Sequence, residues 1–160
     1  MDATFTAEEH YQRGLALLED ERGAEALEHF RAAHALERQS ARYASYYGLG
    51  LALVERRFNK AVELCRDAVK VEFFAPDLYR NLARVHLAFG FKIEGLRYLR
   101  RGLMIDPANA AILADLRELG MRQQPVLAFL PRRHFLNRWL GRLRKQGGEG
   151  AFEALGRAAL

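Results

Sequence analysis

The sequence contains three copies of one helical segment, spaced 34 or 35 residues apart. The segments AEALEHFRAAHALE (24–37), NKAVELCRDAVKVE (59–72) and IEGLRYLRRGLMID (93–106) superimpose without gaps. Two positions hold small residues in every copy, and a position between them holds a larger or more polarisable one; these sets are Ala26, Ala61 and Gly95; Ala33, Ala68 and Gly102; and Phe30, Cys65 and Leu99. Because one short copy cannot bury its own apolar face, the repeat predicts that copies stack to make a shared core.

A second helical pattern precedes each copy, at 8–19, 41–55 and 76–90. Apolar residues recur there every three or four positions, which indicates amphipathic helices. The breaks DERG, RR and FGF between paired segments are short, so paired helices have to run antiparallel. The expected fold class is therefore all-α, with no sheet.

The third unit carries the motif most clearly: Leu82-Ala83, Gly90, Gly95, Gly102 and a closing Asp106-Pro107. Proline disfavours helix in the residue before it, so one helix should end there and another should start soon after. This pattern resembles the tetratricopeptide repeat (TPR) family, whose unit is a helix–turn–helix of 34 residues. The resemblance implies a right-handed superhelical stack of three units (about 7–40, 42–75 and 76–109), a capping helix over 109–121, and hence a TPR domain over 7–121.

The first two units depart from that pattern. Arg38 and Phe73 stand where a closing proline would be. In the second unit, Gly48 and Gly50 each lie one residue from the small-residue position, which the 35-residue step assigns to Leu49.

The resemblance also implies where a partner binds. In TPR stacks the first helices line a concave face that commonly holds a peptide or a helix. On this chain that face is predicted to include Tyr11, Leu15, Tyr43, Tyr46, Arg80, Asn81, Arg84 and Leu87. Tyrosines beside arginines suit a protein partner with acidic groups, although packing of the tyrosines between helices is an alternative. Tyr11 and Leu15 replace the Lys and Asn with which the chaperone-binding subset holds acidic tails, so that specific role is not expected.

No arrangement typical of an enzyme is found. The five histidines form no i, i+4 pair, Cys65 has no cysteine partner, and neither serine lies in a Gly-x-Ser-x-Gly setting. The prediction is therefore no catalytic residue, no metal site and no cofactor. A single cysteine and an N-terminus without a basic and apolar leader suggest the cytoplasm.

Positive charge is concentrated near the C-terminus. Residues 1–116 hold 16 basic and 17 acidic side chains, whereas residues 117–145 hold eight basic and one acidic. The extension 122–160 is predicted to contain an amphipathic helix at about 132–145, whose basic surface comprises Arg133, Arg138, Arg142, Arg144 and Lys145. This helix could cap the stack, contact an acidic partner, or lie on an anionic membrane; nucleic acid is not favoured, because no DNA-reading motif is present.

These observations together predict a non-enzymatic adaptor or scaffold that binds a peptide or helix of another protein on the concave face. Two alternatives remain open at this point: a membrane-surface adaptor attached through 132–145, and a secretion-type chaperone. The oligomeric state is not predicted.

Overall fold

The computed structural model describes residues 5–120, and within that range it contains seven α-helices and no strand. The helices are α1 (Ala7–Glu19), α2 (Gly23–Leu36), α3 (Ala41–Leu53), α4 (Phe58–Val71), α5 (Pro76–Ala88), α6 (Lys92–Ile105) and α7 (Ala110–Glu118). The all-α class predicted from the sequence is confirmed. The basic residues of the predicted helix at 132–145 lie outside the described residues. None of the described helices combines the length and the hydropathy that a bilayer span requires.

Local sequence signals account for the helix starts. Thr6 and Glu9 form a capping box at α1, in which the Glu9 N–H donates to Thr6 Oγ1 (3.2 Å) and the Thr6 N–H donates to Glu9 Oε2 (2.7 Å). Ser40 caps α3, Pro76 occupies the first turn of α5, and Asn109 caps α7. The break at Asp106-Pro107 ends α6 as predicted, and α7 begins at Ala110.

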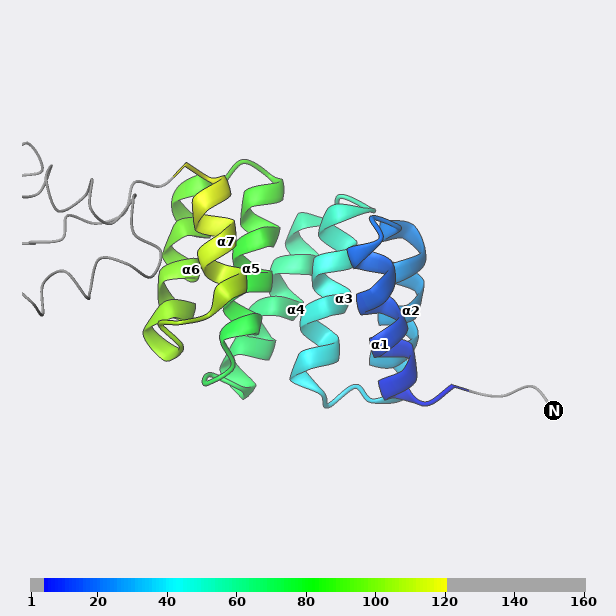
Figure 1. The fold of residues 1–160 in the computed structure, drawn as a ribbon. Helices are drawn as coiled ribbons and strands as arrows, with labels where there is room; N and C mark the ends of the chain where they lie inside the picture. Colours follow the sequence, from blue (N-terminus) through cyan, green and yellow to red (C-terminus); the bar gives the residue numbers. More distant parts are fainter. Residues whose placement is uncertain (1–4, 121–160) are drawn as a thin grey trace, which may run out of the picture. The chain divides into compact units, whose positions relative to one another are not determined.

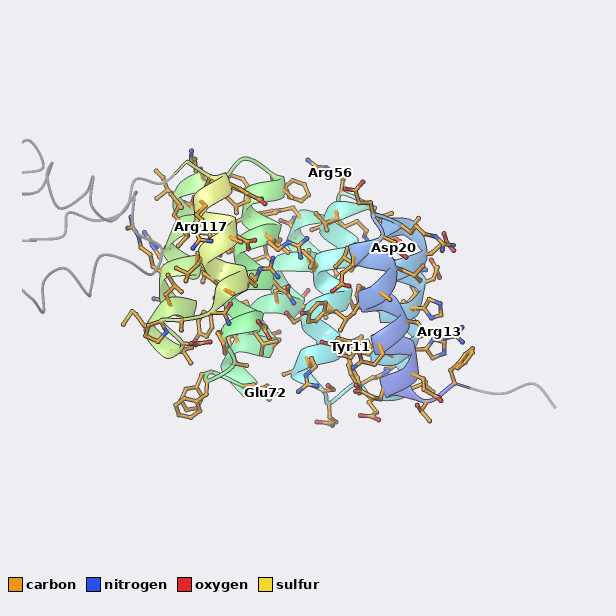
Figure 2. All side chains as sticks on the ribbon, in the orientation of Figure 1. Tyr11, Arg13, Asp20, Arg56, Glu72 and Arg117 are labelled. Carbon is orange, nitrogen blue, oxygen red and sulfur yellow. The ribbon has the colours of Figure 1, made fainter. Side chains whose placement is uncertain are left out.

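Consecutive helices form three antiparallel hairpins, α1–α2, α3–α4 and α5–α6, which stack side by side (Figure 1). Loops within a hairpin and loops between hairpins lie at opposite edges of the stack, as Arg56 and Glu72 show (Figure 2). α7 then packs on the last hairpin: Ile112 is fully buried against Leu99 and Ala83. α7 lies within the range 109–121, for which the sequence predicted a capping helix.

The structure corrects the alignment of the second unit by one residue. The N–H before α2 and before α6 donates five residues back, from Arg22 to the Leu17 carbonyl and from Phe91 to the His86 carbonyl. Before α4 the same bond spans six residues, from Arg57 to Leu51. The extra residue therefore lies in the α3–α4 loop.

Gly48 consequently takes the position that the constant 35-residue step assigned to Leu49. A Cβ atom on Gly48 would lie 2.9 Å from Cys65 Sγ and 3.0 Å from the Ala61 carbonyl oxygen. Gly14 has the matching place in the first hairpin, where a Cβ atom would lie 2.5 Å from the Phe30 ring. Gly48 therefore lets two helix backbones approach closely, and Gly14 makes room for the Phe30 ring.

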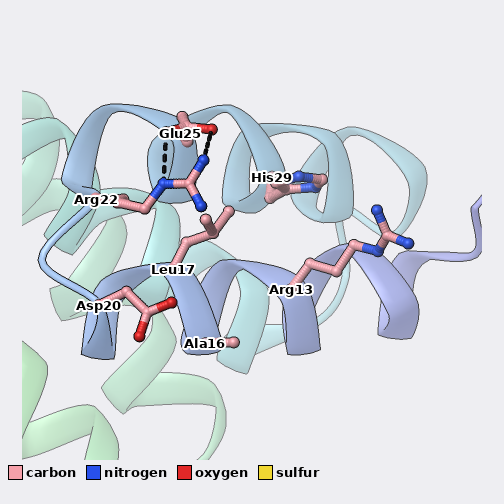
Figure 3. A pocket seen from close by; sticks show the side chains of 7 residues that line it. All are labelled: Arg13, Ala16, Leu17, Asp20, Arg22, Glu25 and His29. Atoms are coloured by element: carbon pink, nitrogen blue, oxygen red, sulfur yellow. Dashed lines mark hydrogen bonds and ion pairs between the residues drawn. The ribbon is translucent and has the colours of Figure 1, made fainter.

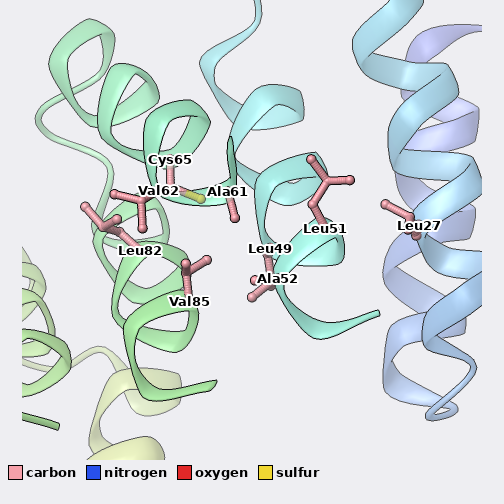
Figure 4. Close-up of a cluster of buried hydrophobic side chains, with 9 residues drawn as sticks. All are labelled: Leu27, Leu49, Leu51, Ala52, Ala61, Val62, Cys65, Leu82 and Val85. Carbon is pink, nitrogen blue, oxygen red and sulfur yellow. The ribbon is translucent and has the colours of Figure 1, made fainter. Parts of the chain in front are cut away.

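The small-residue positions recognised in the sequence are the core of the stack. Ala26, Ala33, Ala61, Ala68, Phe30, Cys65 and Leu99 are all buried. The central cluster combines side chains from α2, α3, α4 and α5, including Leu27, Leu49, Cys65 and Val85 (Figure 4). Cys65 donates a hydrogen bond to the Ser45 carbonyl oxygen (3.3 Å), and burial raises the pKa of its thiol to about 12. Cys65 therefore acts as a small buried apolar group in the core.

Candidate partner-binding face

Three side-chain contacts join α1, α3, α5 and α7 into one layer, here called the first-helix face. Tyr43 Oη donates to Glu8 Oε2 (2.7 Å), which links α3 to α1. Asn81 Nδ2 donates to Ser45 Oγ (3.2 Å), which links α5 to α3. The Arg80 guanidinium binds both carboxylate oxygens of Asp115, which links α5 to α7. This layer is the one that the sequence predicted to meet a partner.

Two of the predicted contact tyrosines are instead part of the core. Tyr11 and Tyr43 are each only 6% exposed, and Tyr11 lies between α1 and α3 (Figure 2). Their rings pack 5.3 Å apart, and the half-buried Tyr46 lies 5.2 Å from Tyr11. Burial, followed by the hydrogen bond to Glu8, raises the pKa of Tyr43 to about 12. The alternative recognised in the sequence is therefore correct for this pair: they hold helices together.

Asn81 and Arg80 are also engaged inside the protein. Asn81 is 1% exposed, and its amide satisfies the buried Ser45 hydroxyl, so the prediction of a surface contact was wrong for Asn81. Arg80 and Asp115 retain 26% and 15% of their side-chain exposure, and their two bonds measure 2.7 and 2.9 Å. Such a fork arrangement uses the donors that a partner carboxylate would otherwise take.

Arg84 differs from Arg80. It is half-buried, and among residues 5–120 it makes neither a hydrogen bond nor an ion pair. Burial lowers the pKa of its guanidinium, and the neighbouring positive charge of Arg80 lowers that pKa further. Tyr46, Asp115 and Glu118 lie near enough to act electrostatically in the opposite direction. The first-helix face therefore holds a partly desolvated cation that has no bonded anion among residues 5–120.

Leu15 and Leu87 are half-buried and serve mainly as packing groups. Leu15 packs against the cluster that contains Tyr11 and Phe30. Leu87 fills the space above Gly95, where an added Cβ atom would come within 2.6 Å of Leu87 Cγ. Leu15 shares its cluster with Tyr46, and Leu87 lies one helical turn after Arg84 on α5.

Two residues of this face were missed in the sequence. Arg42 takes the place that Glu8 and Asp77 take in α1 and α5; it is exposed, and its guanidinium carbon lies 5.8 Å from the Tyr11 ring centroid. The one-residue shift of the second unit hid it, and the positions of Thr6 and Ser40, which cap α1 and α3, would have revealed it. Asp115 was missed because pairing between α5 and α7 leaves no local signal.

A surface pocket of about 320 Å³ lies between α1 and α2 (Figure 3). Its lining consists of Arg13, Ala16, Leu17, Asp20, Arg22, Glu25 and His29. Arg22 and Glu25 bind each other through two bonds of 2.8 and 2.6 Å, and His29 Nδ1 lies 2.9 Å from His10 Nδ1. The residues of this lining include no Ser, Thr, Cys or Lys side chain, and over residues 5–120 no three potential ligand side chains gather for a metal ion.

Solved structures provide the comparison with known proteins. No family model matches the sequence, and no curated protein is significantly similar to it. Similar structures include YrrB, described as a TPR protein with an unusual peptide-binding site (17% identity, TM-score 0.57, 72% of this chain and 59% of that one). They also include the first TPR of Spaghetti (RPAP3) bound to the HSP90 peptide SRMEEVD (16%, 0.57, 72% and 93%) and the Arabidopsis OM64 TPR domain (18%, 0.56, 71% and 93%). This chain has the TPR fold.

The TPR resemblance predicted from the repeat is thus confirmed at the level of fold. The chain spans 59% of YrrB and nearly the whole of the two shorter domains. Within the TPR fold of this chain, the first-helix face combines an occupied arginine, Arg80, with a neighbouring one, Arg84, that has no bonded carboxylate among the described residues.

Proposed function

We propose that this protein is a non-enzymatic interaction module that binds a peptide or helix of another protein on the first-helix face. In this proposal Arg84 binds a carboxylate of the partner, and Tyr46, Leu15 and Leu87 supply the apolar contacts beside it. The observation that carries the proposal is the half-buried guanidinium of Arg84, which has no hydrogen bond or ion pair among residues 5–120.

The energetics favour Arg84 over Arg80 as the contact. Arg80 would have to give up two short bonds to Asp115 before it could bind a partner. Arg84 has already lost part of its hydration on folding, so a partner carboxylate adds hydrogen bonds with little further desolvation of the protein. A hydrogen bond that involves a charged group contributes about 1.5–3 kcal/mol. The Arg80–Asp115 pair holds α5 and α7 in place around Arg84.

The structural neighbours support the class of partner. YrrB has an unusual peptide-binding site, and the RPAP3 domain is bound to SRMEEVD, a peptide with three acidic residues. Carried to this chain as a proposal, these neighbours favour an extended or helical protein segment with acidic groups. A cytoplasmic setting, where the buried Cys65 stays reduced, is part of the same proposal. Membrane attachment through 132–145 and a chaperone role remain predictions from the sequence.

The experiment selects peptides from a random display library against the full chain and measures their affinities for matched variants. We expect Arg84→Gln to weaken binding at least tenfold while leaving the denaturation midpoint unchanged or higher. Arg66→Gln is the control, because Arg66 is an exposed arginine of α4 on the opposite layer. If the selected peptides bind the two variants equally well, the first-helix face is not their site.

A further inference from the structure

The solvent-facing side of α6 carries three arginines between two exposed apolar side chains. This surface, here called the α6 outer face, consists of Ile93, Arg97, Arg100, Arg101 and Met104. Ile93 is 73% exposed and Met104 is 82% exposed. Within residues 5–120 none of the three arginines makes a hydrogen bond or an ion pair, although Arg101 lies 5.9 Å from the Tyr98 ring centroid.

The matching faces of α2 and α4 show what a solvated face of this stack ordinarily holds. In α2 and α4 the place of Arg97 is taken by Glu28 and Glu63, which bind Arg31 (2.8 Å) and Lys60 (3.1 Å). The place of Arg101 in α4 is taken by Asp67, which binds Lys70 (2.7 Å).

The substitutions leave α6 with unbalanced charge. α2 holds one basic and two acidic side chains, α4 holds three and two, and α6 holds four and one. The residue that matches Lys70 is Met104, and the one that matches Asn59 is Ile93. Relative to α4, α6 therefore has arginines in place of two acids and apolar residues in place of two polar ones; in α2 the positions that match Ile93 and Met104 hold alanine.

The chemistry of the face defines its partner. Guanidinium groups bind carboxylates through paired bonds, and Arg is enriched at protein interfaces whereas Lys is depleted. Ile93 and Met104 are eleven residues apart on one helix, which corresponds to about 16 Å. The adjoining face of α4 is nearly balanced, because Glu63 and Asp67 are paired with Lys60 and Lys70 and only Arg66 has no bonded acid within residues 5–120. Most of the unbalanced charge therefore lies along α6 alone, a width that a single acidic helix can follow.

We infer that the α6 outer face docks an acidic amphipathic helix of another protein. The carboxylates of that helix bind Arg97, Arg100 and Arg101. Two of its apolar side chains, about three turns apart, cover Ile93 and Met104. This site lies on the opposite layer from the first-helix face and does not depend on Arg84.

The test measures binding of a synthetic helix to the full chain by fluorescence anisotropy at physiological salt. The probe is a 20-residue Ala- and Glu-rich peptide with two leucines eleven positions apart, and a scrambled peptide of the same composition is its control. We expect Arg97→Gln/Arg100→Gln/Arg101→Gln to weaken probe binding at least tenfold. The triple variant Lys60→Gln/Arg66→Gln/Lys70→Gln removes the same charge from α4 and should weaken it less than threefold.

The remaining arms separate this site from its alternatives. Ile93→Ser/Met104→Ser should weaken the ordered probe and leave the scrambled one unaffected, and Arg84→Gln should have no effect. Equal losses in the two triple variants would mean that net charge alone attracts the peptide, which would overturn the inference. Loss of probe binding in Arg84→Gln would move the peptide to the first-helix face. The protein is also tested with vesicles that contain phosphatidylserine. Binding to these vesicles through the α6 arginines, without binding of the probe, would overturn the inference and make a membrane surface the partner of this face.

Discussion

The bidentate pair between Arg80 and Asp115 should be a main attachment of α7 to the stack. The pair joins α5 to α7 through bonds of 2.7 and 2.9 Å, with 26% and 15% side-chain exposure. Fully exposed pairs contribute about 0.2–1 kcal/mol, and breaking a fully buried pair costs about 3–5 kcal/mol. An intermediate loss of about 1–3 kcal/mol in the free energy of unfolding is therefore expected for either single substitution.

The two substitutions should differ in size. Arg80→Met leaves the Asp115 carboxylate near Arg84, which can partly replace the lost cation, so we expect a loss near the lower limit, about 1 kcal/mol. Asp115→Ala leaves Arg80 and Arg84 as neighbouring cations without the carboxylate that Arg80 binds, so we expect a loss of about 2–3 kcal/mol. The double variant should lose less than the sum, with a coupling energy above about 1 kcal/mol.

Urea denaturation followed by circular dichroism measures the four corners of this cycle. Arg22→Met and Glu25→Ala form the matched control cycle, because that pair also has two short bonds but is 54% and 57% exposed. Its coupling energy should be much smaller than that of Arg80 and Asp115, because solvent screens exposed pairs. Additive effects of the two substitutions, within about 0.3–0.5 kcal/mol, would show that Arg80 and Asp115 do not act as a pair. A larger loss for Arg80→Met than for Asp115→Ala would show that Arg84 does not replace the lost cation.

Three further predictions concern the core. Gly48→Ala should destabilise the protein, whereas Gly23→Ala should not, because an added Cβ atom at Gly23 meets only Val54, at 3.4 Å. Chemical denaturation of both variants measures this difference, and a stabilised Gly48→Ala variant would return Leu49 to the small-residue position. Burial lowers the pKa of His86 below 6.5, so the unfolded chain binds more protons there and the free energy of unfolding should fall as pH drops from about 6.5. His86→Phe removes two buried ring nitrogens that have no partner within residues 5–120, so it should raise the free energy of unfolding by about 1 kcal/mol and weaken this pH dependence. An unchanged pH profile of stability would contradict this prediction. Cys65, with its thiol pKa near 12, should react with a thiol reagent such as DTNB only at the rate of unfolding, which a comparison of labelling in buffer and in urea will show.

The fold could be predicted because three copies of the same helix pair occur in the sequence. Each copy repeats the small residues at helix contacts, so agreement among copies outweighs the missing prolines at Arg38 and Phe73. A constant 35-residue step between units could not fix the register of α3. The second unit has one extra residue in its α3–α4 loop, and the length of that loop follows no sequence pattern. Helix caps were the better guide there, because Thr6 and Ser40 mark matching turns.

The site was only partly predictable for a different physical reason. Periodicity assigns a residue to a helix face, but two neighbouring first helices bury the margin of that face between them. Tyr11 and Tyr43 lie on that margin, so they pack on each other rather than on a partner. The contrast between Arg80 and Arg84 depends on Asp115, which lies 35 residues from Arg80 and on another helix. No pattern within α5 could distinguish the two arginines.

The additional residue between α3 and α4 has a practical consequence for engineering this protein. The stack accommodates it by lengthening one turn at an edge, and Gly48 still meets Cys65. Arg56 has the same left-handed conformation there (φ 57°) as Glu21 (φ 61°) and Gly90 (φ 82°) in the other two hairpin turns. Each doubling of the length of a flexible loop costs only about 0.6 kcal/mol. A short epitope tag or a fluorophore-bearing segment inserted after Glu55 would then report on binding from an edge of the stack, with both proposed docking surfaces left intact.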